Sequence, residues 1–465
     1  MRSRKWLQER EEINDKYSRK KSILSVLHEE KLTALNISLG AKKDIVAVET
    51  AREWDEDVNW PDYNKTFSYE TRLAEETKRF GKEESLSLFR KYELEEYLLD
   101  IIDSMKQSRH MGLEYLYFRD KGIAFIHFKH TNRLGISNGY HAVRMGGIRR
   151  HDPHTEEHAV MTDGLNLSRA MSYKNAAAQI PFGGSKFIVI SDEISVDDKE
   201  SLGFLAYCID RSRSFTGPDM GFTPAHADAI RKEFTQNMTN GNDSNIGPTA
   251  VPTAEGTFSA LQEAAKVKWG SENLENKTAA IQGLGAVGKC LAELLLDAGA
   301  SLIVTEADST VLEQFLEQNE GKPIQVESGD IRFVEADIFC PCAIGGIITA
   351  GIIPQLTFDI VMGAANNQLK AISAEQEIQL AEKLEKHGIL FQVEWMHNTA
   401  GVIAGCEEGI HQGNASLDRV RRHSLQVCRE GTKRNLYESR QRGITPTENA
   451  YVNAQHEIFW QRRLD

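Results

Sequence analysis

Two spacings of hydrophobic residues divide the chain, and the change between them lies near residue 250. Before it, LEYLYFRD, IAFIHFKH and HAVRMGGIR are β-rich segments broken by turns. The helical stretch TDGLNLSRAMSYKNAAAQ then leads to PFGGSKFIVI, which we expect to be a glycine turn followed by an apolar strand. Beyond it, strands such as TAAIQ and SLIVTEAD alternate with helical segments such as KCLAELLLDAGA. That alternation predicts a parallel sheet covered by helices, hence an α/β fold.

Residues 1–108 differ from the rest because they are rich in Glu, Lys and Arg and poor in Gly. Stretches such as KEESLSLFRKYELEEYLLDIIDSM have apolar residues at helical spacing. We expect a mostly helical N-terminal extension with a break near DVNWPDYN, where Pro61 favours a turn. After residue 410 the pattern is helical to the end.

Composition excludes several classes of partner for this chain of 465 residues. The formal net charge of −13 argues against general binding to nucleic acid or to anionic membranes. The first residues, MRSRKWLQEREEINDKYSRKK, lack the apolar core of a secretory signal, and we find no apolar run long enough to cross a bilayer. Cys340 and Cys342 have no second cysteine pair or histidine cluster nearby, so we predict no metal site. We expect a cytoplasmic protein with reduced thiols.

A glycine-rich turn follows the strand TAAIQ and opens a helix. In QGLGAVG, Gly283 suits a tight turn, Gly285 lets the backbone approach a pyrophosphate, and Gly288 allows close packing of helix and strand. Ala286 and Val287 begin the helix, whose N-terminus favours phosphate. Together with the strand that follows, this pattern predicts a dinucleotide site.

An acidic residue after the second strand determines the cofactor that we expect. Glu306 stands where a carboxylate can accept hydrogen bonds from the adenosine ribose hydroxyls and repel a 2′-phosphate. We therefore predict NAD rather than NADP, with Asp308 as the competing acid.

A series of motifs identifies a family. In order these are MGGIR, MSYKNAAAQIPFGGSK, GPDMG, QGLGAVG, CPCAIGG, GAANNQL and HNTAGV. Over roughly residues 112–455 the chain resembles the amino-acid dehydrogenases, which include glutamate, leucine, phenylalanine and valine dehydrogenases. The branched-chain and aromatic members are most similar. The resemblance implies an α/β substrate domain and a Rossmann NAD domain with a cleft between them.

The resemblance implies roles for four polar residues. Lys174 would hold the substrate α-carboxylate, for which a point positive charge is suited. Lys186 would be the catalytic lysine, with its pKa lowered by burial near another cation so that it helps to deprotonate water. Asp219 would carry protons to and from the amino group. Asn366 would contact the substrate carboxylate, with Asn367 as the second choice.

Other residues would line the ligands. Gly146 and Gly147 would form a turn whose backbone lies along the substrate, and Thr253 and Asn398 would lie near the cofactor. The implied reaction is reversible oxidative deamination of an L-amino acid, in which hydride passes from Cα to the nicotinamide and the imine is hydrolysed to a 2-oxo acid and ammonia.

The pocket residues favour an apolar substrate. Glutamate-specific members have a lysine before the Gly-Gly-x-Arg sequence, whereas this chain has Met145. An unpaired substrate carboxylate against a thioether would be costly. Val402, at the expected far wall, is also apolar. Leucine, valine, phenylalanine and tryptophan all remain open, and a glutamate dehydrogenase is the alternative. Phe187 stands where the family usually has a small residue.

We therefore expect three parts. These are a helical extension at 1–108, a substrate-binding domain at 109–250 that the C-terminal helices 410–465 complete, and a Rossmann domain at 251–409. We expect a homo-oligomer. The extension leaves a different class of function open, a non-catalytic NAD-binding or assembly protein.

Overall fold

The computed structural model describes residues 22–40, 46–132 and 140–460. Residues 1–21, from which we inferred that a secretory signal is absent, lie outside the described residues. The described residues fall into two compact units. The first comprises Met1–Ser172, Pro181–Gly247 and Glu408–Asn414, and the second comprises Tyr173–Ile180, Pro248–Glu407 and Ala415–Asp465.

A mixed sheet of eight strands forms the centre of the first unit, in the order β3-β2-β1-β4-β5-β7-β6-β8 among the described residues. Strand β6 runs parallel to β7 and β8, and the other pairs are antiparallel. The strands are β1 (Ala34–Leu39), β2 (Val46–Arg52), β3 (Lys78–Phe80), β4 (Gly112–Phe118), β5 (Ile123–Lys129), β6 (Arg144–His151), β7 (Gly183–Ile190) and β8 (Ser214–Pro218).

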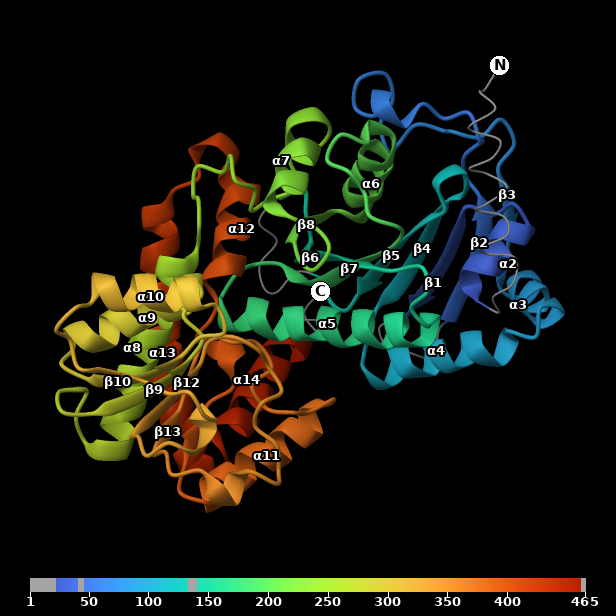
Figure 1. The fold of residues 1–465 in the computed structure, drawn as a ribbon. Coiled ribbons are helices and arrows are strands. Elements are labelled where there is room, and N and C mark those ends of the chain that lie inside the picture. Colours follow the sequence, from blue (N-terminus) through green and yellow to red (C-terminus); the bar gives the residue numbers. More distant parts are fainter. Residues whose placement is uncertain (1–21, 41–45, 133–139, 461–465) are drawn as a thin grey trace. The chain divides into compact units, whose positions relative to one another are not determined.

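Helices cover both faces of this sheet (Figure 1). They are α2 (Ile23–Glu29), α3 (Lys82–Lys91), α4 (Glu95–Gln107), α5 (Glu157–Ala177), α6 (Lys199–Ser212) and α7 (Pro224–Glu233). Side chains alternate across β7, so Ile188 packs with the core under α4 and α5 while Phe187 packs with the core under α6. The period-2 pattern thus gives the sheet two separate cores.

In its described part, residues 22–40 and 46–108, the N-terminal region is not the mostly helical extension that we expected. Strands β1, β2 and β3 lengthen the sheet, and β1 pairs with β4 from Ala34↔Leu116 to Ser38↔Gly112. Its helices bury residues such as Phe89 in the same core as β4 and β5. The abundance of charged residues reflects exposed faces, and it concealed strands whose pairing partners lie far away in the sequence.

The second unit contains a parallel sheet in the order β11-β10-β9-β12-β13-β14. Counted along the chain this is 3-2-1-4-5-6, the order of dinucleotide-binding folds. The strands are β9 (Thr278–Gln282), β10 (Ser301–Thr305), β11 (Ile324–Val326), β12 (Ile338–Pro341), β13 (Ile360–Val361) and β14 (Leu390–Phe391). The prediction of an α/β fold with a parallel, Rossmann-type sheet is confirmed.

Helices pack on both faces of the parallel sheet (Figure 1). The helices of this half of the chain are α8 (Ala250–Trp269), α9 (Ala286–Asp297), α10 (Ser309–Gln318), α11 (Ala374–Lys386), α12 (Ala400–His411), α13 (Leu417–Arg442) and α14 (Pro446–Trp460). Ala279 and Ile281 of β9 face the core under α8 and α9, and Ala280 faces the core under α11.

From Ala415 onward the C-terminal helices belong to the second unit, whereas Glu408–Asn414 belongs to the first, so our expectation that residues 410–465 complete the substrate domain is corrected for all but its first few residues. Leu436 of α13 joins the core under α8, and Ser424 donates to the carbonyl of Pro252 at 3.4 Å. These contacts with α8 determine where α13 lies. The end of α5, including Lys174, also belongs to the second unit.

Among the described helices, none combines the length and the apolar character that a bilayer crossing requires. The described residues also contain no group of three or more His, Cys, Asp or Glu side chains placed to hold a metal ion.

One aromatic residue tests whether the N-terminal region is an integral part of the first unit. Trp60 is 1% exposed, and its ring lies 5.2 Å from the rings of Phe204 and Tyr207 in α6. We expect Trp60→Ala to lower the free energy of unfolding by about 3–5 kcal/mol in urea titrations, because it opens a cavity in this core. Leu99→Ala is the control, since Leu99 is 41% exposed. Equal, small effects of both changes would show that the region adds little to the fold.

Candidate active site

The lysine predicted to be catalytic lies inside the first unit. Lys186 is on β7 and is only 4% exposed. It shares a face of the sheet with Ile188, the face that α5 covers. Parallel pairing of β6 with β7 places Gly147 opposite Lys186, between the pairs Met145↔Gly184 and Ile148↔Phe187. The amine is therefore enclosed by the sheet.

Asp219 meets this amine directly. It follows β8, and its Oδ2 pairs with the Nζ of Lys186. The Nε of Arg149 donates to the same oxygen at 3.2 Å, and the backbone N–H of Met220 donates to Oδ1 at 2.8 Å. The structure thus brings together Lys186 and Asp219 and adds a second cation, Arg149.

The surroundings shift the pKa values of both partners. Burial lowers the pKa of Lys186 and the charge of Arg149 lowers it further, while Asp219 opposes the shift. Burial alone would raise the pKa of Asp219, but the charge and hydrogen bond of Lys186, with Arg149, lower it. The aspartate is therefore held ionised beside a lysine that gives up its proton more readily than a solvated one.

Arg149 extends the cluster to α5 and to the end of β6. It donates from Nη1 to both carboxylate oxygens of Asp163, at 3.2 and 3.1 Å, and His151 lies 2.9 Å from Asp163 Oδ2. Burial favours a raised pKa for Asp163, but His151 and Arg149 lower it below its ordinary value. A chain of contacts therefore runs from Lys186 through Asp219, Arg149 and Asp163 to His151.

The paired glycines lie inside strand β6, which corrects our prediction of a turn. Both contribute close approach. A Cβ on Gly147 would lie 2.9 Å from the Nζ of Lys186, and a Cβ on Gly146 would lie 1.9 Å from the carbonyl oxygen of Ser185. Gly147 therefore leaves room beside the amine, and Gly146 lets β6 and β7 pair.

The structure also gives the surroundings of Phe187 and Met145, two residues considered in the sequence analysis. Phe187 points to the opposite face of the sheet, where its ring lies 4.9 Å from Phe125 and 4.7 Å from His127, so it does not border Lys186. Met145 is 2% exposed on β6.

The glycine turn of the second unit lies at the switch point of the parallel sheet. Gly283 has φ +91°, a conformation that favours glycine, and a Cβ there would lie 2.6 Å from the Cβ of Ala343, after β12. A Cβ on Gly288 would lie 2.0 Å from the carbonyl oxygen of Gly283. Helix α9 begins after Gly285 with Ala286 and Val287.

The start of α9 has room for a dinucleotide phosphate. No side chain caps α9 among the residues that the structure describes, and a Cβ on Gly285 would have nothing within 4 Å. Open space thus lies over the positive end of a twelve-residue helix.

Glu306 and Asp308 have different tasks. Glu306 directly follows β10, and its carboxylate accepts from the N–H of Leu284 at 2.6 Å and from that of Ala307 at 2.8 Å. Asp308 caps α10, accepting from the N–H of Thr310 at 2.9 Å. The glutamate, rather than the aspartate, lies beside the glycine turn.

A second polar cluster surrounds Lys174 within the second unit. Burial raises the pKa of Glu394, and the charge of Lys174 opposes the rise. Burial lowers the pKa of His397 to about 4, and the charge of Lys174 lowers it further. Asn398 donates to the Oδ1 of Asn366 at 2.9 Å. Glu394 and His397 thus lie within reach of the charge of Lys174, and Asn398 connects their segment to Asn366 in the loop after β13.

Three predicted residues have simpler surroundings. Thr253, in α8, donates to the carbonyl of Thr249 at 2.7 Å. Val402 is half-buried in α12, and Asn367 is exposed with φ +52°.

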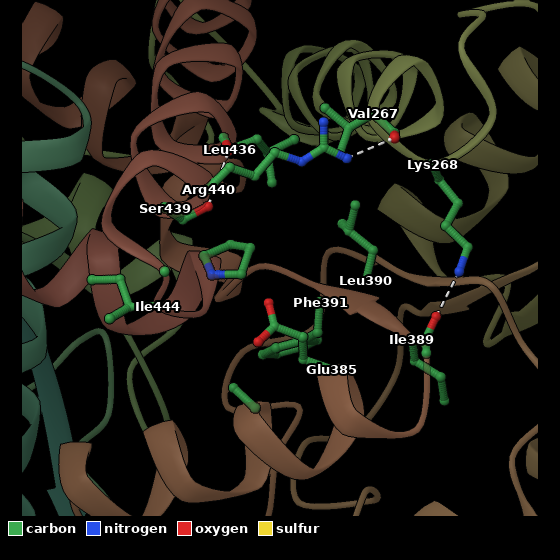
Figure 2. Close-up of a pocket in the computed structure, with 14 residues that line it drawn as sticks. Val267, Lys268, Glu385, Ile389, Leu390, Phe391, Leu436, Ser439, Arg440 and Ile444 are labelled. Carbon is green, nitrogen blue, oxygen red and sulfur yellow. Dashed lines mark hydrogen bonds between the residues drawn. The ribbon is translucent and has the colours of Figure 1, made fainter.

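One cavity of the second unit lies apart from these residues (Figure 2). It has a volume of about 360 Å³, and residues of α8, α11, β14 and α13 line it. Its fourteen lining residues include none of the predicted site residues. Its cations already have partners, because Arg440 donates to the Val267 carbonyl at 2.9 Å and Lys268 to that of Gly388 at 2.5 Å.

Our sequence analysis missed Arg149, Asp163, His151 and Glu394. Arg149 and His151 could have been found from the sequence, because they occupy alternate positions after Gly147 once that segment is taken as a strand. Asp163 and Glu394 lie far from Lys186 and Lys174 in sequence, and no local pattern indicates them.

Comparison with known proteins agrees with the motifs. Residues 135–236 match the model of the Glu/Leu/Phe/Val dehydrogenase dimerisation domain. Phenylalanine dehydrogenase of Lysinibacillus sphaericus is 39% identical over 274 residues, covering 57% of this chain and 69% of that protein. Leucine dehydrogenase of Geobacillus stearothermophilus is 36% identical over 304 residues, covering 63% and 77%.

A solved structure is also similar. L-tryptophan dehydrogenase from Nostoc punctiforme has a TM-score of 0.65 and 28% identity, covering 78% of this chain and 99% of that one. Enzymes of this kind use NAD or NADP to oxidise amino acids. The chain therefore belongs to the Glu/Leu/Phe/Val dehydrogenase family and is an amino-acid dehydrogenase.

Proposed function

We propose that the protein catalyses the NAD-dependent, reversible oxidative deamination of an apolar L-amino acid to its 2-oxo acid and ammonia. The observation that carries this proposal is the pair of buried Lys186 and half-buried Asp219, with a lysine that deprotonates readily beside an ionised carboxylate. A surface lysine or a packing aspartate would not require this arrangement. The pair also argues against a non-catalytic assembly protein.

The proton transfers follow from the pair. Asp219 takes a proton from the substrate ammonium, which leaves the amine lone pair free to form a C=N bond as the Cα–H bond breaks. A nicotinamide held in the second unit would accept the hydride from Cα. Lys186 in its neutral form takes a proton from water, whose oxygen adds to the C=N carbon and gives a carbinolamine. Asp219 then returns a proton to nitrogen. The C–N bond breaks as the hydroxyl oxygen forms C=O, and the hydroxyl proton leaves with the ammonia as ammonium.

We assign substrate carboxylate binding to Lys174 and Asn366. A single ammonium and an amide N–H can hold the two carboxylate oxygens. The dehydrogenases most similar in sequence include several named for phenylalanine, leucine, valine and L-tryptophan, all apolar amino acids. Met145 and Val402 are consistent with such a side chain, and neither can pair with a distal carboxylate.

For the cofactor we propose NAD, held by the turn from Gly283 to Gly288 and by Glu306. We propose that Thr253 lies near its nicotinamide carboxamide and that Asn398 also contacts the cofactor. The name of the matched family model, a dimerisation domain, supports a homo-oligomer. We also propose that the enzyme acts in the cytoplasm, on small molecules and not on nucleic acid or a membrane.

A screen of L-amino acids tests the substrate class. With NAD, we expect kcat/KM to be roughly a hundredfold or more higher for the best of leucine, valine, phenylalanine and tryptophan than for glutamate, since burial of an unpaired carboxylate costs several kcal/mol. The measurement is NADH formation in initial-rate assays. Faster turnover of glutamate would replace the proposal with a glutamate dehydrogenase.

Removal of the catalytic amine tests the chemistry. We expect Lys186→Ala to lower kcat by about 10²–10⁴-fold, the range for loss of a general acid–base group, with NAD affinity unchanged in a fluorescence titration. Lys199→Ala is the matched control, because Lys199 lies in the same unit with 57% of its side chain exposed. Substantial activity in Lys186→Ala would contradict the assignment.

Cofactor choice depends on the carboxylate beside the glycine turn. We expect Glu306→Ala to narrow the preference for NAD over NADP in kcat/KM by roughly tenfold, about 1.4 kcal/mol. Asp308→Asn should keep both the helix cap and the preference, because Asn is an equally good cap. Unchanged discrimination in Glu306→Ala would remove Glu306 from the ribose site.

A further inference from the structure

A buried carboxyl group supports the loop that carries Asn366. Glu394 lies in a short 3-10 turn after β14 and is 3% exposed. Its Oε1 accepts a hydrogen bond of 2.8 Å from the backbone N–H of Asn367. It is therefore bonded to the residue that directly follows a proposed ligand of the substrate carboxylate.

Asn367 adopts an uncommon backbone conformation. Its φ of +52° is in the left-handed region, which costs most L-residues about 1–2 kcal/mol and asparagine less. Its carbonyl also accepts from the N–H of Gly346 at 2.6 Å. Glu394 thus accepts from the backbone N–H of Asn367, and Gly346 donates to its carbonyl oxygen. Both polar backbone groups of the residue beside Asn366 are therefore held.

The segment that contains Glu394 holds the same loop at two other points. Nε2 of His397 lies 3.0 Å from the carbonyl oxygen of Gly363, and Asn398 donates to the carbonyl of Ala364 at 3.1 Å. Asn398 also donates to Asn366 itself. Of these residues, Glu394 alone bonds a backbone N–H of the loop among the contacts described here.

The charge of the proposed carboxylate lysine also acts on Glu394. Burial raises the pKa of Glu394, and the backbone N–H of Asn367 and the charge of Lys174 oppose the rise. Burial and the charge of Glu394 raise the pKa of Glu377 to about 8, and Tyr451 donates a hydrogen bond of 2.5 Å to Glu377. A pair of buried carboxyl groups is costly, and a packing role alone would be met by an apolar residue.

We infer that Glu394 is a positioning residue for amino-acid binding, which fixes Asn366 in relation to Lys174 by holding the backbone of Asn367. This inference rests on the proposed function, in which Lys174 and Asn366 bind the substrate carboxylate. The hydrogen bond, rather than the charge, is the active element, and a glutamine can reproduce it because its amide oxygen accepts in the same way.

Three variants of the full-length protein test the inference by kinetics. Glu394→Ala removes the acceptor, and we expect KM for the best amino acid to rise about tenfold or more with kcat changed by less than about threefold, as when uniform binding is lost. Glu394→Gln should restore KM to within about threefold of the wild-type value. Glu263→Ala is the control, since Glu263 is also buried, in α8 of the same unit, but pairs with Lys266 and Arg429.

A second measurement needs neither activity nor cofactor. Amide hydrogen–deuterium exchange at residues 363–368 should be faster in Glu394→Ala than in the wild type, and unchanged in Glu394→Gln and in Glu263→Ala. An inactive wild-type protein would refute the proposed function, and the exchange result would still decide this inference. Unchanged exchange or KM in Glu394→Ala, or equal changes in Glu263→Ala, would overturn it.

Discussion

The buried contact between Lys186 and Asp219 is the interaction on which the rest of the account depends. Removing an ammonium group from water is expensive, and the cost is met here by a carboxylate that Arg149 and a backbone N–H also hold. Burial and Arg149 both favour the neutral amine, while Asp219 favours the charged one. This balance allows one lysine to exchange protons and still remain enclosed in a sheet.

The geometry of the sheet creates that contact. Parallel pairing of β6 with β7 and β8 brings Gly147, Lys186 and the residue after Pro218 to neighbouring positions. Gly147 has no side chain, so the amine has space on the side where a Cβ would come within 2.9 Å of it. Glycine in the interior of a strand lowers its stability, and here it leaves the amine of Lys186 accessible.

Local patterns predicted the parts of the molecule that local physics determines. The turn from Gly283 to Gly288 follows β9 as expected, because a left-handed residue and a helix start both have short sequence signals. Lys186 and Asp219 were identified through motifs of the family, and the structure brings them together.

Non-local contacts account for what the sequence did not reveal. Strand β1 pairs with β4 across a long stretch of chain, and the charged composition of this region concealed it. Helix α13 lies on α8 because of side chains such as Leu436, which no spacing rule assigns to one unit or the other. Glu394 became visible only once its bond to Asn367 was known.

The most direct test is the titration of the Lys186 amine itself. NMR of lysine side chains labelled with ¹³C and ¹⁵N, with Lys186→Arg used to assign the signal, would measure its pKa in the wild type and in Asp219→Asn. Our account predicts a wild-type pKa below that of an ordinary lysine, and a still lower one in Asp219→Asn, because Asp219 opposes the shift. A wild-type pKa equal to that of a solvated lysine, or one that Asp219→Asn leaves unchanged, would contradict it.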